Sequence, residues 1–200
     1  NRPKEAVTFY RQAADIAVEQ GDLKNEGLRR NNIADILRKL QQYEEARRET
    51  QRAIECKQSL GHEAAIWNTF NILRDIETNT DNPAAARAAW QQARDAYLAY
   101  RQQGGYAQAS GGKLVDQVLG LLAQQPVEDM QALCNELVEL TNNPEAPDSI
   151  KLLIQAMVAI LNGSRDKALA DDPALDYDDA AEVLFLIERL NQGSERAREG

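Results

Sequence analysis

Alanines recur at a spacing of 40 residues through the first hundred residues of the chain. Gly21 and Gly61 share this spacing, and each follows a segment of helical periodicity, where a left-handed C-cap favours glycine. A repeat of this length is typical of stacked supersecondary units, and it constrains the fold more than any other feature. The two alanine series are Ala6, Ala46 and Ala86, and Ala13, Ala53 and Ala93.

Each unit of the repeat is predicted to form two helices. Residues 23–40 carry apolar side chains at helical spacing, and residues 44–59 carry the alanines seven apart, which let a neighbouring helix approach closely. Residues 41–43 form a short polar turn that ends in an aromatic side chain. With few β-branched residues, six prolines and eleven glycines, the chain has a helix-forming composition that excludes an all-β fold.

The pattern resembles the tetratricopeptide repeat (TPR) family over residues 4–103. The resemblance implies an all-α, right-handed superhelix of antiparallel helix pairs, in which the first helix of each pair lines a concave groove. The period of 40 exceeds the family's usual period of about 34, and residues 77–83 lengthen one turn. The best copy consists of Ile33, Ala34, Leu37, Tyr43, Ala46, Ala53 and Ile54.

The chain is also similar, more weakly, to the C-terminal repeat regions of large bacterial multidomain signalling proteins. It opens at Asn1 in what corresponds to the second helix of a pair, so we expect a fragment of a larger protein. An uncovered apolar face on the helix at residues 4–20 would promote homo-oligomers.

Charge divides the chain near its most glycine-rich stretch. Residues 1–103 hold 16 Lys and Arg against 15 Asp and Glu, whereas residues 104–200 hold 7 against 17. The change predicts a boundary between two structural units. Together with the resemblance, it leads us to expect TPR-like repeats over 1–103, a linker over 104–112, a C-terminal helical bundle or cap over 113–192 and a disordered tail over 193–200. Helices of the cap are predicted at 113–124, 127–140, 149–161, 164–169 and 178–191.

The glycine-rich segment Gly104–Lys113 is not a phosphate-binding loop. Ala107 and Leu114 stand where that loop needs a glycine and a hydroxyl, and no buried strand precedes it. The acids at 171–182 lack the glycine of an EF-hand, and we interpret Asp176–Glu182 as N-cap and first-turn residues of the last helix. His62 is the only histidine and stands without a nucleophile or ligand at motif spacing. The sequence therefore predicts no catalytic residues, no metal and no cofactor.

Seven basic residues cluster in one repeat, interleaved with acids. We expect solvated helix faces with pairs four residues apart, and therefore no nucleic-acid binding. No apolar run is long enough to span a membrane, and the buried-type Cys56 and Cys134 favour a cytoplasmic protein with reduced thiols. The basic residues are Arg29, Arg30, Arg38, Lys39, Arg47, Arg48 and Arg52.

Asparagines are the most informative polar residues. Asn32 and Asn68 occupy matching places on successive first helices, with Asn31 and Asn71 nearby. The resemblance implies that asparagines at such places bond the backbone of a bound peptide, since an amide both donates and accepts. The basic residues do not match a full clamp for a terminal carboxylate. The predicted partner-binding residues are Asn32, Asn68, Asn31, Asn71, Arg29, Arg30 and Arg74.

These features predict a non-catalytic protein–protein interaction module that holds a partner peptide or helix in the concave TPR groove. The alternative is a regulatory sensor segment of a larger NTPase or effector protein, in which the groove binds a ligand or an intramolecular element. A third reading, autonomous catalysis, lacks a converging acid, base or nucleophile.

Overall fold

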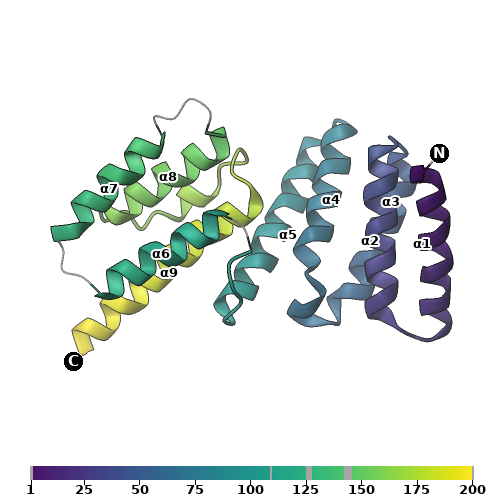
Figure 1. Ribbon diagram of the computed structural model, residues 1–200, viewed down its shortest axis with the longest axis horizontal. Coiled ribbons are helices and arrows are strands. Elements are labelled where there is room, and N and C mark those ends of the chain that lie inside the picture. The colour runs from purple at the N-terminus through teal and green to yellow at the C-terminus, as the bar shows by residue number, and fades with distance from the viewer. Residues whose placement is uncertain (1, 109, 125–127, 142–145, 200) are drawn as a thin grey trace. The chain divides into compact units, whose positions relative to one another are not determined.

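The computed structural model describes residues 2–108, 110–124, 128–141 and 146–199. Over these residues the regular structure is helical, and no β-strand is present (Figure 1). The all-α prediction is therefore confirmed. The chain divides into two compact units, Asn1–Ala96 and Tyr97–Gly200.

The first unit consists of antiparallel helices joined by short turns. Helix α2 contacts both α1 and α3, α3 contacts α4, and α2 and α4 also contact each other. The elements are α1 (Arg2–Glu19), α2 (Leu23–Lys39), α3 (Tyr43–Gln58), the 3₁₀ turn η1 (Gly61–Ala64), α4 (Ile66–Asn79) and the first part of α5 (Pro83–Gln102).

Left-handed residues end the segments of this unit at intervals of 20. Gly21, Gln41, Gly61 and Asp81 have φ values of 65°, 60°, 66° and 56°. After Gly21, Gln41 and Asp81, the N–H of the following residue donates to the carbonyl five residues before it, which caps the C-terminus of the helix. The Gln42 N–H, for example, donates to the Leu37 carbonyl at 2.9 Å. Since α4 continues to Asn79, its turn is as short as the turn after α2, and the predicted longer turn at 77–83 is wrong.

The repeated alanines bring the helices together. Ala46, Ala53 and Ala93 are completely buried, as their spacing predicts. Around Ala46 the core joins α1, α2, α3 and α4. Its buried members are Val7, Ile33, Leu37, Ala46 and Ile76.

The second unit is a set of helices around α8 and α9. Helix α9 contacts α6, α8 and η2, and α7 contacts α8. The apolar α8 supplies much of the core through Leu153, Ile154, Met157 and Ile160, which are buried. The elements are α6 (Ser110–Gln124), α7 (Glu128–Thr141), α8 (Asp148–Leu161), the 3₁₀ turn η2 (Lys167–Ala170) and α9 (Tyr177–Glu199).

Three predicted boundaries differ from the structure. The units divide after Ala96 rather than 103, because the side chains of Tyr97 and Arg101 bond to groups of the second unit. The predicted linker at 104–112 ends early, since α6 begins at Ser110, and the tail at 193–200 is helical to Glu199. The His62 side chain, Val127 and residues 142–144 lie outside the described part of the chain.

Candidate functional site

Polar side chains from α2 and α4 form a continuous surface in the first unit. On α2, Asn31 and Asn32 precede Asp35 and Arg38 by about one or two turns, and on α4 Asn68 and Asn71 precede Asp75 in the same way. Because α2 and α4 are in contact, these rows adjoin. We call this surface the α2–α4 polar face; it comprises Asn31, Asn32, Asp35, Arg38, Asn68, Asn71, Arg74 and Asp75.

One ion pair links the two rows, and others lie within each row. Arg38 Nη1 lies 3.6 Å from Asp75 Oδ2 across the helices, while Arg38 Nη2 donates to Asp35 at 2.8 Å. Arg74 Nη2 donates to Asp75 at 2.8 Å, and Lys39 Nζ to Asp35 at 2.5 Å. Burial alone would raise the pKa of Asp35, but hydrogen bonds from Lys39 and Arg38 lower it below the ordinary 3.8. The charges of this face are therefore largely compensated within it.

A buried lysine supports the face from below. Lys57 of α3 donates from Nζ to the Thr69 hydroxyl at 2.9 Å, and that hydroxyl donates to Asn31 Oδ1 at 2.6 Å. The lysine stem passes Gly27 of α2, where an added Cβ would lie only 3.1 Å from Lys57 Cγ. Burial lowers the pKa of Lys57 to about 8. Asn31 thus has its carbonyl engaged by the core and positions α4 against α2.

Of the remaining predicted partner-binding residues, the three asparagines lie on the α2–α4 polar face and the two arginines lie elsewhere on α2. Asn32 is half-buried and Asn68 exposed, and both lie on the face. Asn71 is half-buried, and its Oδ1 is buried without a hydrogen-bond partner among the described residues. Arg30 is directed instead to α3, where Nη1 donates to Glu49 at 3.0 Å. Arg29 is half-buried on α2.

Sequence reasoning missed several members of the face and its support. Asp35, Arg38 and Asp75 stand three to seven residues after the asparagines, so helical spacing could have placed them on the same surface. Lys57 and Thr69 gave no such signal, because their contact depends on how α3 and α4 pack.

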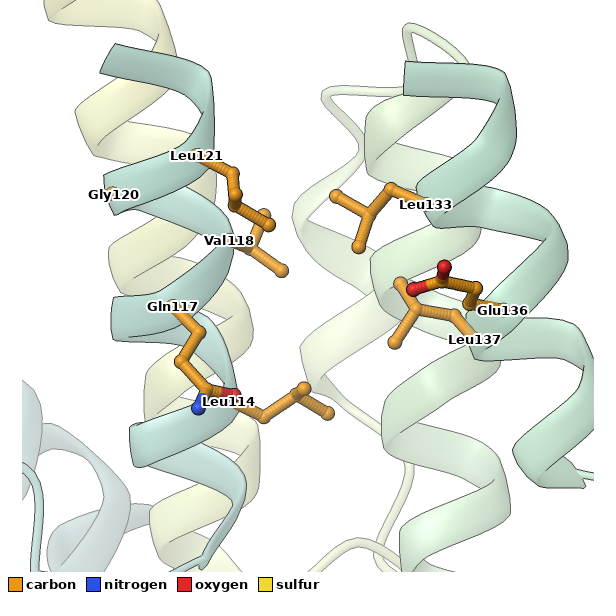
Figure 2. A pocket seen from close by; sticks show the side chains of 8 residues that line it. All are labelled: Leu114, Gln117, Val118, Gly120, Leu121, Leu133, Glu136 and Leu137. Atoms are coloured by element: carbon orange, nitrogen blue, oxygen red, sulfur yellow. The ribbon is translucent and has the colours of Figure 1, made fainter. Parts of the chain in front are cut away.

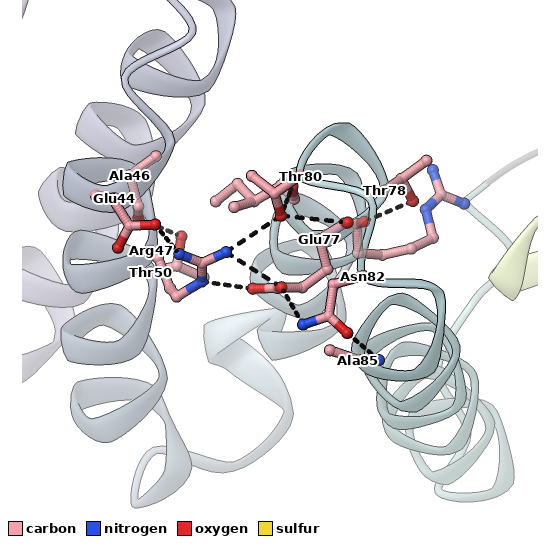
Figure 3. A network of polar contacts seen from close by, with 11 residues as sticks. Glu44, Ala46, Arg47, Thr50, Glu77, Thr78, Thr80, Asn82 and Ala85 are labelled. Atoms are coloured by element: carbon pink, nitrogen blue, oxygen red, sulfur yellow. Dashed lines mark hydrogen bonds and ion pairs between the residues drawn. The ribbon is translucent and has the colours of Figure 1, made fainter.

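Ion pairs between helices hold the face in place. Arg47 of α3 donates two hydrogen bonds to the Glu77 carboxylate of α4, from Nε at 2.6 Å and from Nη2 at 3.2 Å (Figure 3). Its Nη2 also donates to the Thr80 hydroxyl at 3.2 Å. Asn82 donates to the same carboxylate at 3.1 Å. Such bidentate pairs fix geometry as well as adding energy, and here they raise the pKa of Arg47.

The predicted pairing of the basic cluster is confirmed in part: Glu26 pairs with Arg30 and Asp35 with Lys39, each four residues apart, but other pairs join different helices. The least exposed carboxylates, Glu26 and Glu77, pair between helices, where Arg52 Nε donates to Glu26 at 2.8 Å and Arg47 Nε to Glu77 at 2.6 Å. Arg11 pairs with the more exposed Glu45. Pairing across 26 or more residues is a tertiary property that local spacing does not show.

The second unit contains a buried polar cluster at the start of α6. Glu182 of α9 lies 2.9 Å from Arg101 Nε and accepts from the Tyr97 hydroxyl at 3.1 Å. Asp179 lies against Gly111, where an added Cβ would stand 1.9 Å from its Oδ1. Burial, the largest cause in each case, raises the pKa of both carboxyls to about 7.

This cluster confirms in part the prediction for the acids at 176–182. Asp178 and Asp179 do stand in the first turn of α9, as expected. The prediction did not include their burial: Asp179 and Glu182 are 4% and 1% exposed and face the protein interior.

No family model, curated protein or solved structure matches the chain. Where the structure describes side chains, no group of three or more His, Cys, Asp or Glu is arranged to hold a metal. Within the described helices, none combines the length and the apolar character needed to cross a bilayer.

Cys56 and Cys134 are free and buried, as predicted, and burial raises both thiol pKa values.

Proposed function

We propose that the chain is a TPR-like interaction module whose α2–α4 polar face binds an extended peptide of a partner protein without chemical turnover. Support comes from the repeated helix pairs and from the contact between their first helices, α2 and α4. The observation that carries the proposal is the pair of amide side chains on these adjoining helices, half-buried Asn32 of α2 and exposed Asn68 of α4.

The charges of the face favour a peptide backbone over a terminal carboxylate. Arg38 and Arg74 are each bonded to an aspartate, so neither presents an uncompensated cation. Amide groups, by contrast, offer a donor and an acceptor that match successive backbone groups of an extended chain. Asn32 and Asn68 flank the ion pairs on the two helices and supply these groups.

Selection from a random peptide library displayed on phage supplies a ligand for the test. Affinities of the selected peptides are measured by fluorescence anisotropy for the wild-type chain and for the Asn32→Ala/Asn68→Ala variant. Loss of two hydrogen bonds of about 1 kcal/mol each weakens binding by roughly tenfold to thirtyfold.

The matched control is Asn162→Ala/Asn191→Ala, which removes two exposed asparagines from the second unit. It leaves the affinity unchanged. Peptides that bind the Asn32→Ala/Asn68→Ala variant as tightly as the wild type would contradict the proposal.

A further inference from the structure

An apolar groove of about 480 Å³ lies between α6 and α7 in the second unit. Leu114, Val118 and Leu121 of α6 face Leu133 and Leu137 of α7 across it, and Glu136 stands among them (Figure 2). The α6 residues are four and three positions apart, so they form one ridge along the helix. The groove is therefore bounded by two parallel rows of aliphatic side chains.

The packing of the unit explains why this space is open. Helix α6 rests on α9, whereas α7 rests on α8. The facing rows are thus carried by different helix pairs. Val118 and Leu137, 1% and 2% exposed, form the floor of the groove, whereas Leu121 remains 45% exposed at its rim. A groove between two helices with apolar rows is the geometry that accepts the apolar stripe of a third helix, with anchors three to four residues apart.

The charge of the two helices identifies the kind of helix. The α6 and α7 segments contain one basic residue, Lys113, and five acids, and residues 104–200 carry 7 Lys and Arg against 17 Asp and Glu. Glu136 lies in the groove wall itself. A second copy of this acidic unit or an anionic lipid surface would bring like charges together, whereas a Lys- or Arg-bearing helix is attracted. The acids are Asp116, Glu128, Asp129, Glu136 and Glu139.

We propose that the α6–α7 groove binds a basic amphipathic helix of a partner protein. Its leucine-type stripe enters between the two apolar rows, and a flanking Lys or Arg meets Glu136. This site is independent of the α2–α4 polar face, because its lining residues all belong to the second unit.

Synthetic helical peptides of about 18 residues, five turns, serve as probes for the full chain. One carries leucines at three- and four-residue spacing with flanking lysines. A second replaces the lysines by glutamates, and a third keeps the composition but scrambles the leucine positions. The expected order in fluorescence anisotropy is tight binding of the first peptide, with at least about tenfold weaker binding of the others.

Matched variants locate the site. Leu121→Lys weakens the lysine peptide by about tenfold or more, since burial of one leucine is worth about that factor. The control Val138→Lys, at a residue that is 44% exposed but outside the groove lining, leaves binding unchanged. Glu136→Lys shifts the preference toward the glutamate peptide, whereas Glu139→Lys, also exposed on α7 and outside the lining, has a smaller effect.

Three results would overturn the proposal. The first is equal binding of the three peptides, and the second is an equal effect of Leu121→Lys and Val138→Lys on binding. The third is a dimer in sedimentation that Leu121→Lys dissociates, because the occupant would then be a second copy of the chain. Circular dichroism of each variant verifies the helical fold. Asn32→Ala/Asn68→Ala leaves binding of the lysine peptide unchanged, so failure of this proposal and failure of the proposed function are distinguishable.

Discussion

Replacing Gly111 by alanine tests the packing of α6 against α9. A Cβ at this position would stand 1.9 Å from Asp179 Oδ1 and 2.7 Å from Leu153 Cδ2, whereas ordinary contacts begin at 3.4 Å. The helices must therefore separate, or the buried carboxylate must leave its place. Gly120 of the same helix has no atom within 4 Å of an added Cβ and provides the matched control.

The two substitutions have opposite expected signs. Alanine favours a helix over glycine by up to about 1 kcal/mol, so Gly120→Ala raises the free energy of unfolding by about 0.5–1 kcal/mol. At Gly111 the same gain is outweighed by an overpacking cost of about 1–3 kcal/mol, increased by displacement of a buried polar group. We expect Gly111→Ala to lower the free energy of unfolding by about 1–2 kcal/mol.

The positions of the tryptophans make the assay specific for each unit. Trp67 and Trp90, the only two in the chain, both lie in residues 1–96, so their fluorescence follows the first unit alone. Far-UV circular dichroism follows the helices of both units. In urea titrations, Gly111→Ala shifts the dichroism component of the second unit to lower denaturant and leaves the fluorescence transition in place.

A double-mutant cycle identifies the cause. In an Asp179→Ala background the main obstruction is absent, so Gly111→Ala lowers stability by about 1 kcal/mol less than in the wild type. The reasoning is refuted if Gly111→Ala is as stable as Gly120→Ala, or if the two substitutions are additive.

Three further predictions concern turns, titration and self-association. Gln41 has a left-handed φ of 60°, a conformation that costs glycine little, so Gln41→Gly raises the stability of the first unit by about 0.5–1 kcal/mol in urea titrations. The control Gln42→Gly, at φ −90°, lowers the stability. The reverse order would contradict the cap assignment. The pKa values of Asp179 and Glu182 are both raised to about 7, so the folded state binds more protons than the unfolded state between about pH 4 and 7. Stability of the second unit therefore falls as pH rises through this window. Asp179→Asn reduces this dependence and Glu182 retains the rest, which unaltered pH curves would disprove. Phe9 is 69% exposed on α1, and Phe9→Lys reduces any concentration-dependent association in sedimentation velocity; an unchanged association constant would exclude this face.

Local features of the sequence were sufficient to predict the helices. The alanine spacing reports small residues at helix contacts, and the burial of Ala46, Ala53 and Ala93 agrees with it. Gly21 and Gly61 revealed their left-handed caps, since glycine favours that conformation. Gln41 adopts the same conformation without a residue type that indicates it. Asp81 is of a type that is enriched there, but this signal was not used, and the turn at 77–83 was misjudged.

Tertiary packing determines what the sequence did not show. The partner of Glu26 is Arg52, 26 residues away, although the nearer Arg30 also approaches it. Gly111 and Gly112 look like a linker in composition, yet the absence of a Cβ is what lets Asp179 and Glu182 approach α6. The asparagine rows could be placed on one face, because helical spacing is local, but their support by Lys57 could not.

Backbone N-methylation of a selected peptide tests the central claim most directly. If Asn32 and Asn68 bond the peptide backbone, methylating the contacted N–H weakens binding to the wild-type chain by about 1 kcal/mol, or roughly fivefold, and has little effect on binding to Asn32→Ala/Asn68→Ala. The account predicts this non-additivity in the anisotropy cycle. Equal weakening of the wild type and the variant by the methyl group would show that these amides do not hold a peptide backbone.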